Sequence, residues 1–263
     1  MSSRVALWSA PGILAVATCL GCTTLGPSPG VTFSGARPES RPGAEAQVGI
    51  VPGFHLSDAP QRDDNPGVGM LQAAGWVDLG SLIEPVDGLA VGARFVEELM
   101  EPMVRYRFWL DSDHRFSFGV VGFLTFAEGS EEGADVAYWH GGVEASTDIR
   151  LTPVNRWAEL HLQLGLNLTG LRADGHYCRD REGFAVDCTE ESVRVGADLT
   201  GTYPTAFLGL SVDLFRDVPV LHVLRVSTMI AGGSMPRIRD EKQASDRGWF
   251  SWGLNLEVGL GAW

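Results

Sequence analysis

Basic residues are scarce in this sequence. Lys and Arg number 20 against 33 Asp and Glu, which gives a formal net charge of −13 at pH 7. We therefore do not expect nucleic acid as a partner, because phosphate binding needs a basic surface. Lysine is nearly absent, with Lys242 as its one occurrence. Since lysines mostly face water, their scarcity indicates that little of the regular structure faces bulk water.

Long apolar runs are missing beyond the start of the chain. The run over residues 5–20 follows Arg4 and is interrupted by Pro11, so it is too short and too broken for a membrane-spanning helix. A basic residue, an apolar stretch and then small residues are typical of an export signal. No later run reaches the roughly 20 apolar residues that a spanning helix needs. This excludes a helical membrane protein.

Cysteine is limited to four residues. The first pair lies in Cys19-Leu20-Gly21-Cys22, which resembles a bacterial lipobox and implies that Cys22 is acylated and becomes the new N-terminus. Ordinary cleavage after Ala17 is the alternative. The second pair, Cys178 and Cys188, is expected to form a disulfide in an oxidising compartment, worth about 3 kcal/mol for a short loop. The HExxH motif is absent, and we expect neither a metal nor a cofactor.

Composition divides the rest of the chain into two parts. Residues 23–46 are rich in Pro, Gly, Ser and Thr and have no apolar period, which predicts a flexible linker. Regular alternation begins after it. The expected organisation is therefore an export signal with a lipobox-like end over residues 1–22, a linker over 23–46 and one β-barrel domain over 47–263.

Alternation of apolar and polar residues is the main pattern that the sequence does contain. Leucines occupy every second position from Leu160 to Leu168, with polar or small residues between them. This period of two predicts a strand with one apolar face. Similar patterns predict strands at residues 47–57, 70–79, 89–96, 103–110, 116–126, 139–151, 158–171, 205–215, 222–231 and 250–260. The expected fold is all-β: a single antiparallel up-and-down transmembrane β-barrel of about ten strands, with eight or twelve as alternatives. A partly helical structure over 69–82 is a further alternative.

Long and short connections alternate along this pattern. If the first strand runs outward, the outer connections are 58–69, 97–102, 127–138, 172–204 and 232–248. The inner connections are 80–88, 111–115, 152–157 and 216–221. Long outer loops and short periplasmic turns are typical of outer-membrane barrels. Most of the acidic surplus falls in the outer connections, so we expect acidic loops around a nearly neutral barrel wall.

Alternation does not decide which face of the wall points inward. A soluble barrel of the lipocalin type would place its leucines inside and bind an apolar ligand. Equal numbers of arginines and carboxylates in the polar row favour the opposite orientation, because each ion in a narrow lumen needs a partner. Aromatic residues near the strand ends are also typical of the girdles of membrane barrels. The expected lumen charge network is Asp78, Arg94, Arg105, Arg107, Glu144, Asp148, Arg150, Asp213, Arg225 and Glu257.

The last expected strand carries a resemblance to a known class. Apolar residues occupy every second position from Trp252 to Leu260, and the chain ends at Trp263. This segment resembles the C-terminal strand of small outer-membrane β-barrels of Gram-negative bacteria, whose final aromatic residue is recognised during assembly. The resemblance covers residues 47–263. It implies an integral barrel in the outer membrane, with membrane lipid and the barrel assembly machinery as partners, and we expect a monomer.

These observations favour a non-enzymatic function. Balanced charges inside about ten strands predict a plugged lumen, and hence a structural or surface-interaction role; a narrow solute channel is the alternative. Another alternative is an enzyme at the outer rim, where His55, Asp58 and His140 are candidates for a general base and its orienting carboxylate. The acidic connection 172–204 is the candidate surface for a partner.

Overall fold

Eleven β-strands make up most of the described chain. The computed structural model describes Thr32, Ala36 and residues 43–54, 67–79, 88–96, 99–131, 134–155, 157–179, 193–196, 199–214, 221–234 and 248–261. The strands are β1 (Gly43–Phe54), β2 (Gly67–Asp78), β3 (Leu89–Val96), β4 (Leu99–Trp109), β5 (Phe116–Glu131), β6 (Ala134–Arg150), β7 (Ala158–Arg179), β8 (Val193–Gly196), β9 (Leu199–Leu214), β10 (Leu221–Ser234) and β11 (Gly248–Gly261). Within these ranges, no helix is long and apolar enough to cross a bilayer.

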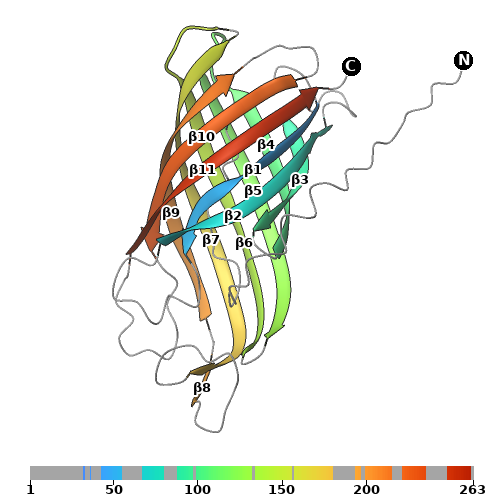
Figure 1. Cartoon of the computed structure of the whole chain (residues 1–263), viewed down its shortest axis with the longest axis vertical. Coiled ribbons are helices and arrows are strands. Elements are labelled where there is room, and N and C mark those ends of the chain that lie inside the picture. Colours follow the sequence, from blue (N-terminus) through green and yellow to red (C-terminus); the bar gives the residue numbers. More distant parts are fainter. Residues whose placement is uncertain are drawn as a thin grey trace, which may run out of the picture.

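Ten of these strands form a closed barrel (Figure 1). Each pairs antiparallel with the next, from β1 to β7 and then through β9 and β10 to β11, and the ring closes between β1 and β11. The short strand β8 pairs with the far end of β7. A closed ring has no exposed edge of unpaired backbone groups. The prediction of a single antiparallel up-and-down barrel of ten strands is therefore confirmed.

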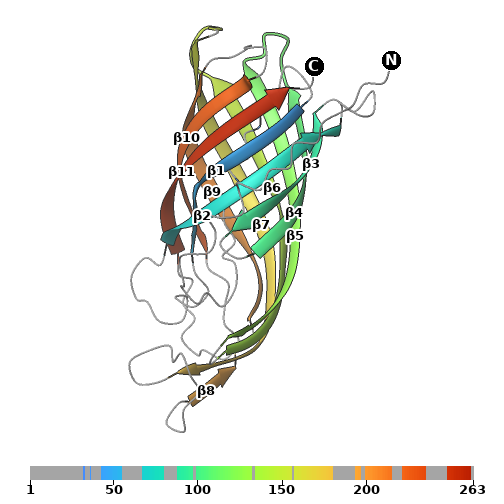
Figure 2. The same ribbon diagram turned by 45° about the vertical axis from the view of Figure 1, so that its right-hand side comes forward.

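Several strands are longer than the sequence pattern predicted. β5 continues to Glu131 and β6 begins at Ala134, so most of the expected connection 127–138 is a paired hairpin. β7 likewise continues to Arg179, and Figure 2 shows these ends reaching beyond the rest of the wall on the side that carries β8. Backbone hydrogen bonds continue because they do not require an apolar face. β2 is a strand throughout, so the helical alternative is wrong for the described part of that region.

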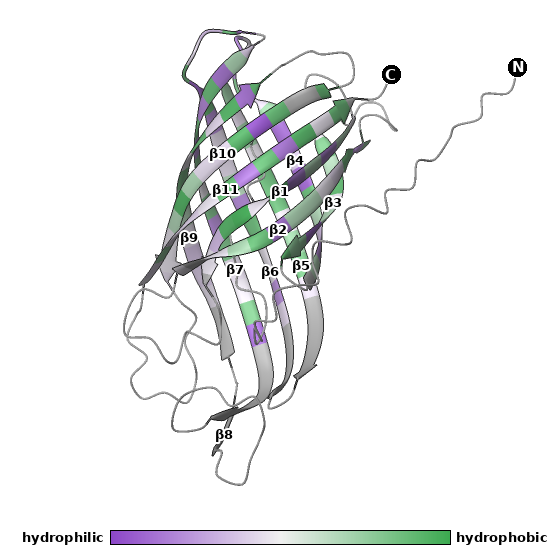
Figure 3. Cartoon of the chain, viewed as in Figure 1, coloured by the Kyte–Doolittle hydropathy of each residue, from purple (hydrophilic) through white to green (hydrophobic). Residues whose placement is uncertain are grey.

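Hydrophobic and hydrophilic residues alternate along the strands of the wall (Figure 3), and the exposures of their side chains show which face each kind occupies. Outward positions carry large apolar side chains, and Leu166 and Leu124 are 64% and 59% exposed. Inward positions carry polar and charged side chains, and Arg94, Arg105 and Arg107 are at most 2% exposed. The inward face also holds an apolar cluster of Ala74, Trp76, Ala90, Met103, Val121 and Phe123. The outward face is therefore apolar, whereas the inward face carries the ions together with this apolar cluster.

A tight turn joins β4 to β5. The Asp111 carboxylate accepts hydrogen bonds from the backbone N–H groups of Phe116 and Arg115, at 2.7 and 2.9 Å. His114 has a φ of 52°, a left-handed conformation that histidine tolerates better than most residues. Its ring stacks on Trp109 with the centroids 4.7 Å apart. The hydrogen bond from Phe116, followed by that from Arg115, lowers the pKa of Asp111 below its usual value.

We predict that Asp111→Ala destabilises the folded barrel more than Asp113→Ala, a control in the same exposed turn. Because the folded pKa of Asp111 is lowered, its contribution is present above the unfolded pKa and is lost as the pH falls through the folded pKa. The difference between the variants should be largest at neutral pH and shrink in acid. Urea unfolding followed by tryptophan fluorescence measures it, and equal losses at neutral pH would contradict the role given to Asp111.

Candidate functional site

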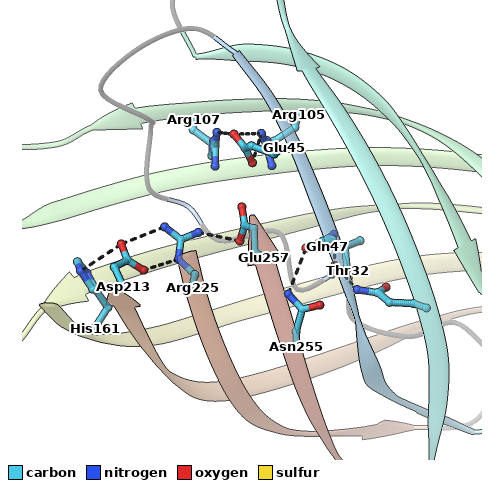
Figure 4. Close-up of polar contacts among 11 residues, drawn as sticks. Thr32, Glu45, Gln47, Arg105, Arg107, His161, Asp213, Arg225, Asn255 and Glu257 are labelled. Atoms are coloured by element: carbon cyan, nitrogen blue, oxygen red, sulfur yellow. Dashed lines mark hydrogen bonds and ion pairs between the residues drawn. The ribbon is translucent and has the colours of Figure 1, made fainter. Parts of the chain in front are cut away.

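One group of ions in the lumen is centred on Glu45 of β1. Its carboxylate oxygens each accept from Nη2 of Arg105 at 2.9 Å, and one also accepts from Nη2 of Arg107 at 2.5 Å. All three side chains are buried. The Arg105 guanidinium lies over the Trp76 ring, 4.3 Å from its centroid, where the ring face attracts a cation. A single carboxylate thus links β1 to β4 through the lumen, as Figure 4 shows.

A second group is centred on Arg225 of β10. Its Nε donates to Oδ1 of Asp213 at 2.7 Å, and its Nη1 donates to Oε2 of Glu257 at 3.0 Å. Asp213 on β9 and Glu257 on β11 are the residues directly opposite Arg225 in the two neighbouring strands. His161 extends the group, since its Nε2 lies 3.8 Å from Oδ2 of Asp213 and 3.5 Å from Oε2 of Glu159 (Figure 4). The pairing register of β9, β10 and β11 therefore brings Arg225 next to both carboxylates.

The third group surrounds Glu101, near the start of β4. Arg94 is its direct partner on β3 and donates from Nε to Oε2 of Glu101 at 2.5 Å. Nε2 of His140 contacts the other carboxylate oxygen. The Arg94 guanidinium also lies 5.3 Å from the centroid of the Phe123 ring. All of these residues are buried. Glu101 lies four positions before Arg105 along β4, so this group lies at a different level of the barrel from Glu45.

A residue that precedes all the strands lies between these groups. Thr32 is fully buried, and its backbone N–H and its hydroxyl donate to Oε2 and Oε1 of Glu144 at 2.7 and 2.6 Å. Its carbonyl oxygen accepts from Nε2 of Gln47 at 3.4 Å and of Gln72 at 3.3 Å. Ala36 is also fully buried. Residues ahead of β1 thus enter the interior of the barrel.

The structure places the predicted lumen residues as follows. Arg150 is half-buried, and its Nη2 donates to the carbonyl oxygen of Asp113 in the β4–β5 turn, so it lies at the end of the barrel. The others are buried: Asp78, Arg94, Arg105, Arg107, Glu144, Asp148, Asp213, Arg225 and Glu257. The linker predicted over 23–46 overlaps the barrel, because β1 begins at Gly43 and Thr32 lies in the lumen.

Other predicted sites fall partly or wholly outside the described residues. Those outside are Cys22, His55, Asp58 and Cys188. Acylation, the rim-site chemistry and the disulfide therefore stay predictions. Cys178 lies on the far part of β7 that pairs with β8. His140 is buried in the lumen against Glu101, so a carboxylate that the sequence did not suggest is its partner.

Three lumen carboxylates were missed by the sequence analysis. Glu45 was assigned to the linker and Glu101 to an outer connection, because their strands begin earlier than the alternation suggested. Glu159 lies at the start of β7, two positions before His161 and on the same face. Each is in phase with the polar row of its strand. Extending that phase by two positions would have found Glu45 and Glu101, and Glu159 already lies within the strand predicted over 158–171.

Hydrogen bonding and charge pairing are the chemistry that the described lumen offers. Its arginines face carboxylates, and two of its amides contact Thr32. Nδ2 of Asn255 donates to Oε1 of Gln47 at 3.4 Å. Among the residues described, no group of three or more His, Cys, Asp and Glu is arranged to hold a metal ion. The arrangement stabilises the wall and holds one residue of the chain's own N-terminal region.

We predict that Glu45→Gln destabilises the barrel by roughly 3–5 kcal/mol, because it removes the charge that two buried arginines share. Adding Arg107→Met should recover part of this loss, since one of the two cations is then gone. Urea unfolding in detergent micelles, followed by tryptophan fluorescence, measures both variants. Asp113→Asn, which neutralises an exposed carboxylate, is the matched control. A loss for Glu45→Gln as small as that of the control would contradict the paired-ion interpretation.

Comparison with protein-family models and with curated proteins finds no match to this chain. Its function is therefore inferred from the two faces of the barrel wall.

Proposed function

We propose that the chain is an integral outer-membrane β-barrel whose lumen is closed by its own side chains, and that it has a structural or surface-interaction role without enzymatic activity. The observation that carries this proposal is the inverted wall: large apolar side chains face outward, and buried ions face inward. Lipid around the wall and polar groups within it are the arrangement that membrane barrels share.

The outer face supports a lipid environment. Leu166, Leu168 and Val143 lie on the neighbouring strands β6 and β7 and are 64%, 55% and 52% exposed. Similar exposed residues occur on β4, β5, β9, β10 and β11. Soluble monomers rarely expose an apolar surface of this extent, because it would associate in water. In hydrocarbon the same side chains are favourable, and the closed ring satisfies the backbone hydrogen bonds that lipid cannot.

The inner face supports a closed lumen. The arginines that point inward are among the largest fully buried side chains of the described chain. The groups around Glu45, Arg225 and Glu101 hold them through ion pairs between different strands. An interior of ten strands has little space beyond its side chains, so an ion would have to displace these pairs in order to pass. A non-conducting barrel follows from this packing.

Location and partners are part of the same proposal. The signal-like start and the lipobox-like Cys22 are features of an exported lipoprotein, and the last strand is similar to those recognised by the barrel assembly machinery. The far ends of β5, β6 and β7, together with β8, project from one end of the barrel (Figure 2). We place the partner surface there, within residues 172–204, with Cys178 and Cys188 as its proposed disulfide.

We predict that Leu166→Arg impairs folding into lipid vesicles by about 2–4 kcal/mol, the penalty for arginine on the lipid face near the middle of a bilayer. Val154→Arg is the matched control, because Val154 is 67% exposed but lies in the turn after β6. Urea titration of vesicle-bound protein, followed by tryptophan fluorescence, measures the difference. If both variants fold equally well, and both do so without detergent or lipid, the outer face is a water-facing surface and the proposal is wrong.

We also predict that the wild-type protein does not form steady channels in planar bilayers at neutral pH. We expect the buried ion pairs, together with the N-terminal residue held in the lumen, to block a water path of the kind that porins have. Single-channel recording measures conductance, and insertion is checked separately by heat-modifiable migration of the recovered protein. Steady open channels in the unmodified protein would favour the solute channel instead.

A further inference from the structure

We propose that the middle of the lumen is a binding site for a peptide segment, and that Thr32 of the same chain occupies it and keeps the lumen closed. The site consists of Glu144 on β6, Gln47 on β1 and Gln72 on β2. Together they engage the backbone N–H, the hydroxyl and the carbonyl oxygen of Thr32. The closing role rests on the proposed membrane function, whereas the binding site does not.

Thr32 bridges opposite sides of the barrel. In the ring of ten strands, β1 and β6 are five positions apart in either direction, so they face each other through the lumen. Thr32 donates to Glu144 on one of these strands and accepts from Gln47 on the other. A residue bonded to both walls at once lies in the path between them. Thr32 therefore obstructs the lumen because it lies between the two walls, and not merely because it is buried.

Glu144 is the main hydrogen-bond acceptor for Thr32. It is fully buried, and both of its carboxylate oxygens accept hydrogen bonds from Thr32. Its other neighbours are the Asn167 side chain and the Arg94 guanidinium, which interacts with it electrostatically. A buried carboxylate without donors is strongly unfavourable. If Thr32 left, Glu144 would lose both of these hydrogen bonds, so entry of water into the lumen would favour release of Thr32.

The wall also leaves room for the segment beside Thr32. Gly119 faces the lumen on β5, and a Cβ atom at this position would lie 2.9 Å from the Cα of Ala36. A larger residue there would force the N-terminal chain away from the wall. Gly122 lies on the same strand but faces outward, and a Cβ atom there would have no neighbour within 4 Å. The two glycines therefore offer a matched pair of positions for substitution.

The contacts also define the chemical class of the ligand. The N–H and C=O groups that Glu144, Gln47 and Gln72 engage are backbone groups, which most residues possess. The second hydrogen bond to Glu144 requires a hydroxyl, which limits the docked residue to Ser or Thr. The ligand is thus a peptide with a hydroxylated residue at the point of contact. Covalent linkage to β1 keeps the local concentration of Thr32 high, which favours this segment over free peptides.

The first test measures whether the segment is docked. Ala36→Cys places a thiol beside the contact without altering Thr32, and its reaction with a water-soluble maleimide in detergent-solubilised protein is located by peptide mapping. We expect slow labelling in this background, because Ala36 is fully buried. Adding Glu144→Ala, Gly119→Leu or Thr32→Val should raise the rate about tenfold or more, the factor expected when hydrogen bonds to a charged group are lost. Adding Gly122→Leu or Thr32→Ser should leave it unchanged.

Heat-modifiable migration on gels checks that each variant is still a folded barrel. The pair Thr32→Val and Thr32→Ser changes no wall residue, so it tests the site even if the Glu144 or Gly119 variants fail to fold. Rapid labelling in the Ala36→Cys background alone, or equal rates for Thr32→Val and Thr32→Ser in folded protein, would overturn the binding site.

The second test measures closure of the lumen. In planar bilayers, Gly119→Leu and Thr32→Val should open more often than the wild type and Gly122→Leu. Fast labelling at position 36 without any added channel openings would overturn the closing role of Thr32. Failure of the membrane proposal has a different signature: neither the wild type nor Gly122→Leu would insert into bilayers, while labelling in detergent would still separate the variants.

Discussion

Charge pairing inside a narrow lumen is the constraint on which the rest of this barrel depends. Because side chains alternate between the two faces of a strand, a wall with leucines outside must carry its polar residues inside, where an unpaired ion is strongly unfavourable. Strand register solves this problem. Arg94 lies directly opposite Glu101, and Arg225 lies opposite both Asp213 and Glu257. A slip of one residue would exchange the faces and separate these partners, so the ions help to specify the register that pairs them.

The same side chains also hold together the seam between the first and last strands. β1 and β11 pair over eight positions, from Gly43↔Gly261 to Ile50↔Leu254. Asn255 of β11 donates to Gln47 of β1, so a lumen contact accompanies the backbone ladder. Glu45, on β1, also binds arginines of β4, which is not adjacent to β1 in the ring. The seam is thus supported from inside as well as along its edge.

The sequence allowed prediction of the wall and of most ions inside it, but not of the N-terminal residue held in the lumen. A period of two, as from Leu160 to Leu168, identified strands and their apolar face, and all ten expected strands of the ring are present. The strand ends were less predictable, since pairing continues beyond the apolar residues; that is why Glu45 and Glu101 were missed. The position of Thr32 could not be predicted from the sequence, for another reason. It lies in a region without any period, and its position depends on Glu144, which is distant in the sequence.

Two free-energy contributions decide whether Thr32 stays docked in the lumen: the entropy lost on closing the loop to β1 and the hydrogen bonds that Thr32 forms. Closing a short loop between Thr32 and β1 costs on the order of 2 kcal/mol in chain entropy. Each hydrogen bond to the ionised Glu144 returns about 1.5–3 kcal/mol, and the longer bonds from Gln47 and Gln72 add less. The docked state is therefore favoured by only a few kcal/mol, much less than the stability of a complete barrel wall. Because Glu144 would lose both hydrogen bonds from Thr32 if that residue left a dry lumen, undocking is favoured when water reaches the carboxylate. The closed state is thus maintained by the exclusion of water as much as by the hydrogen bonds themselves.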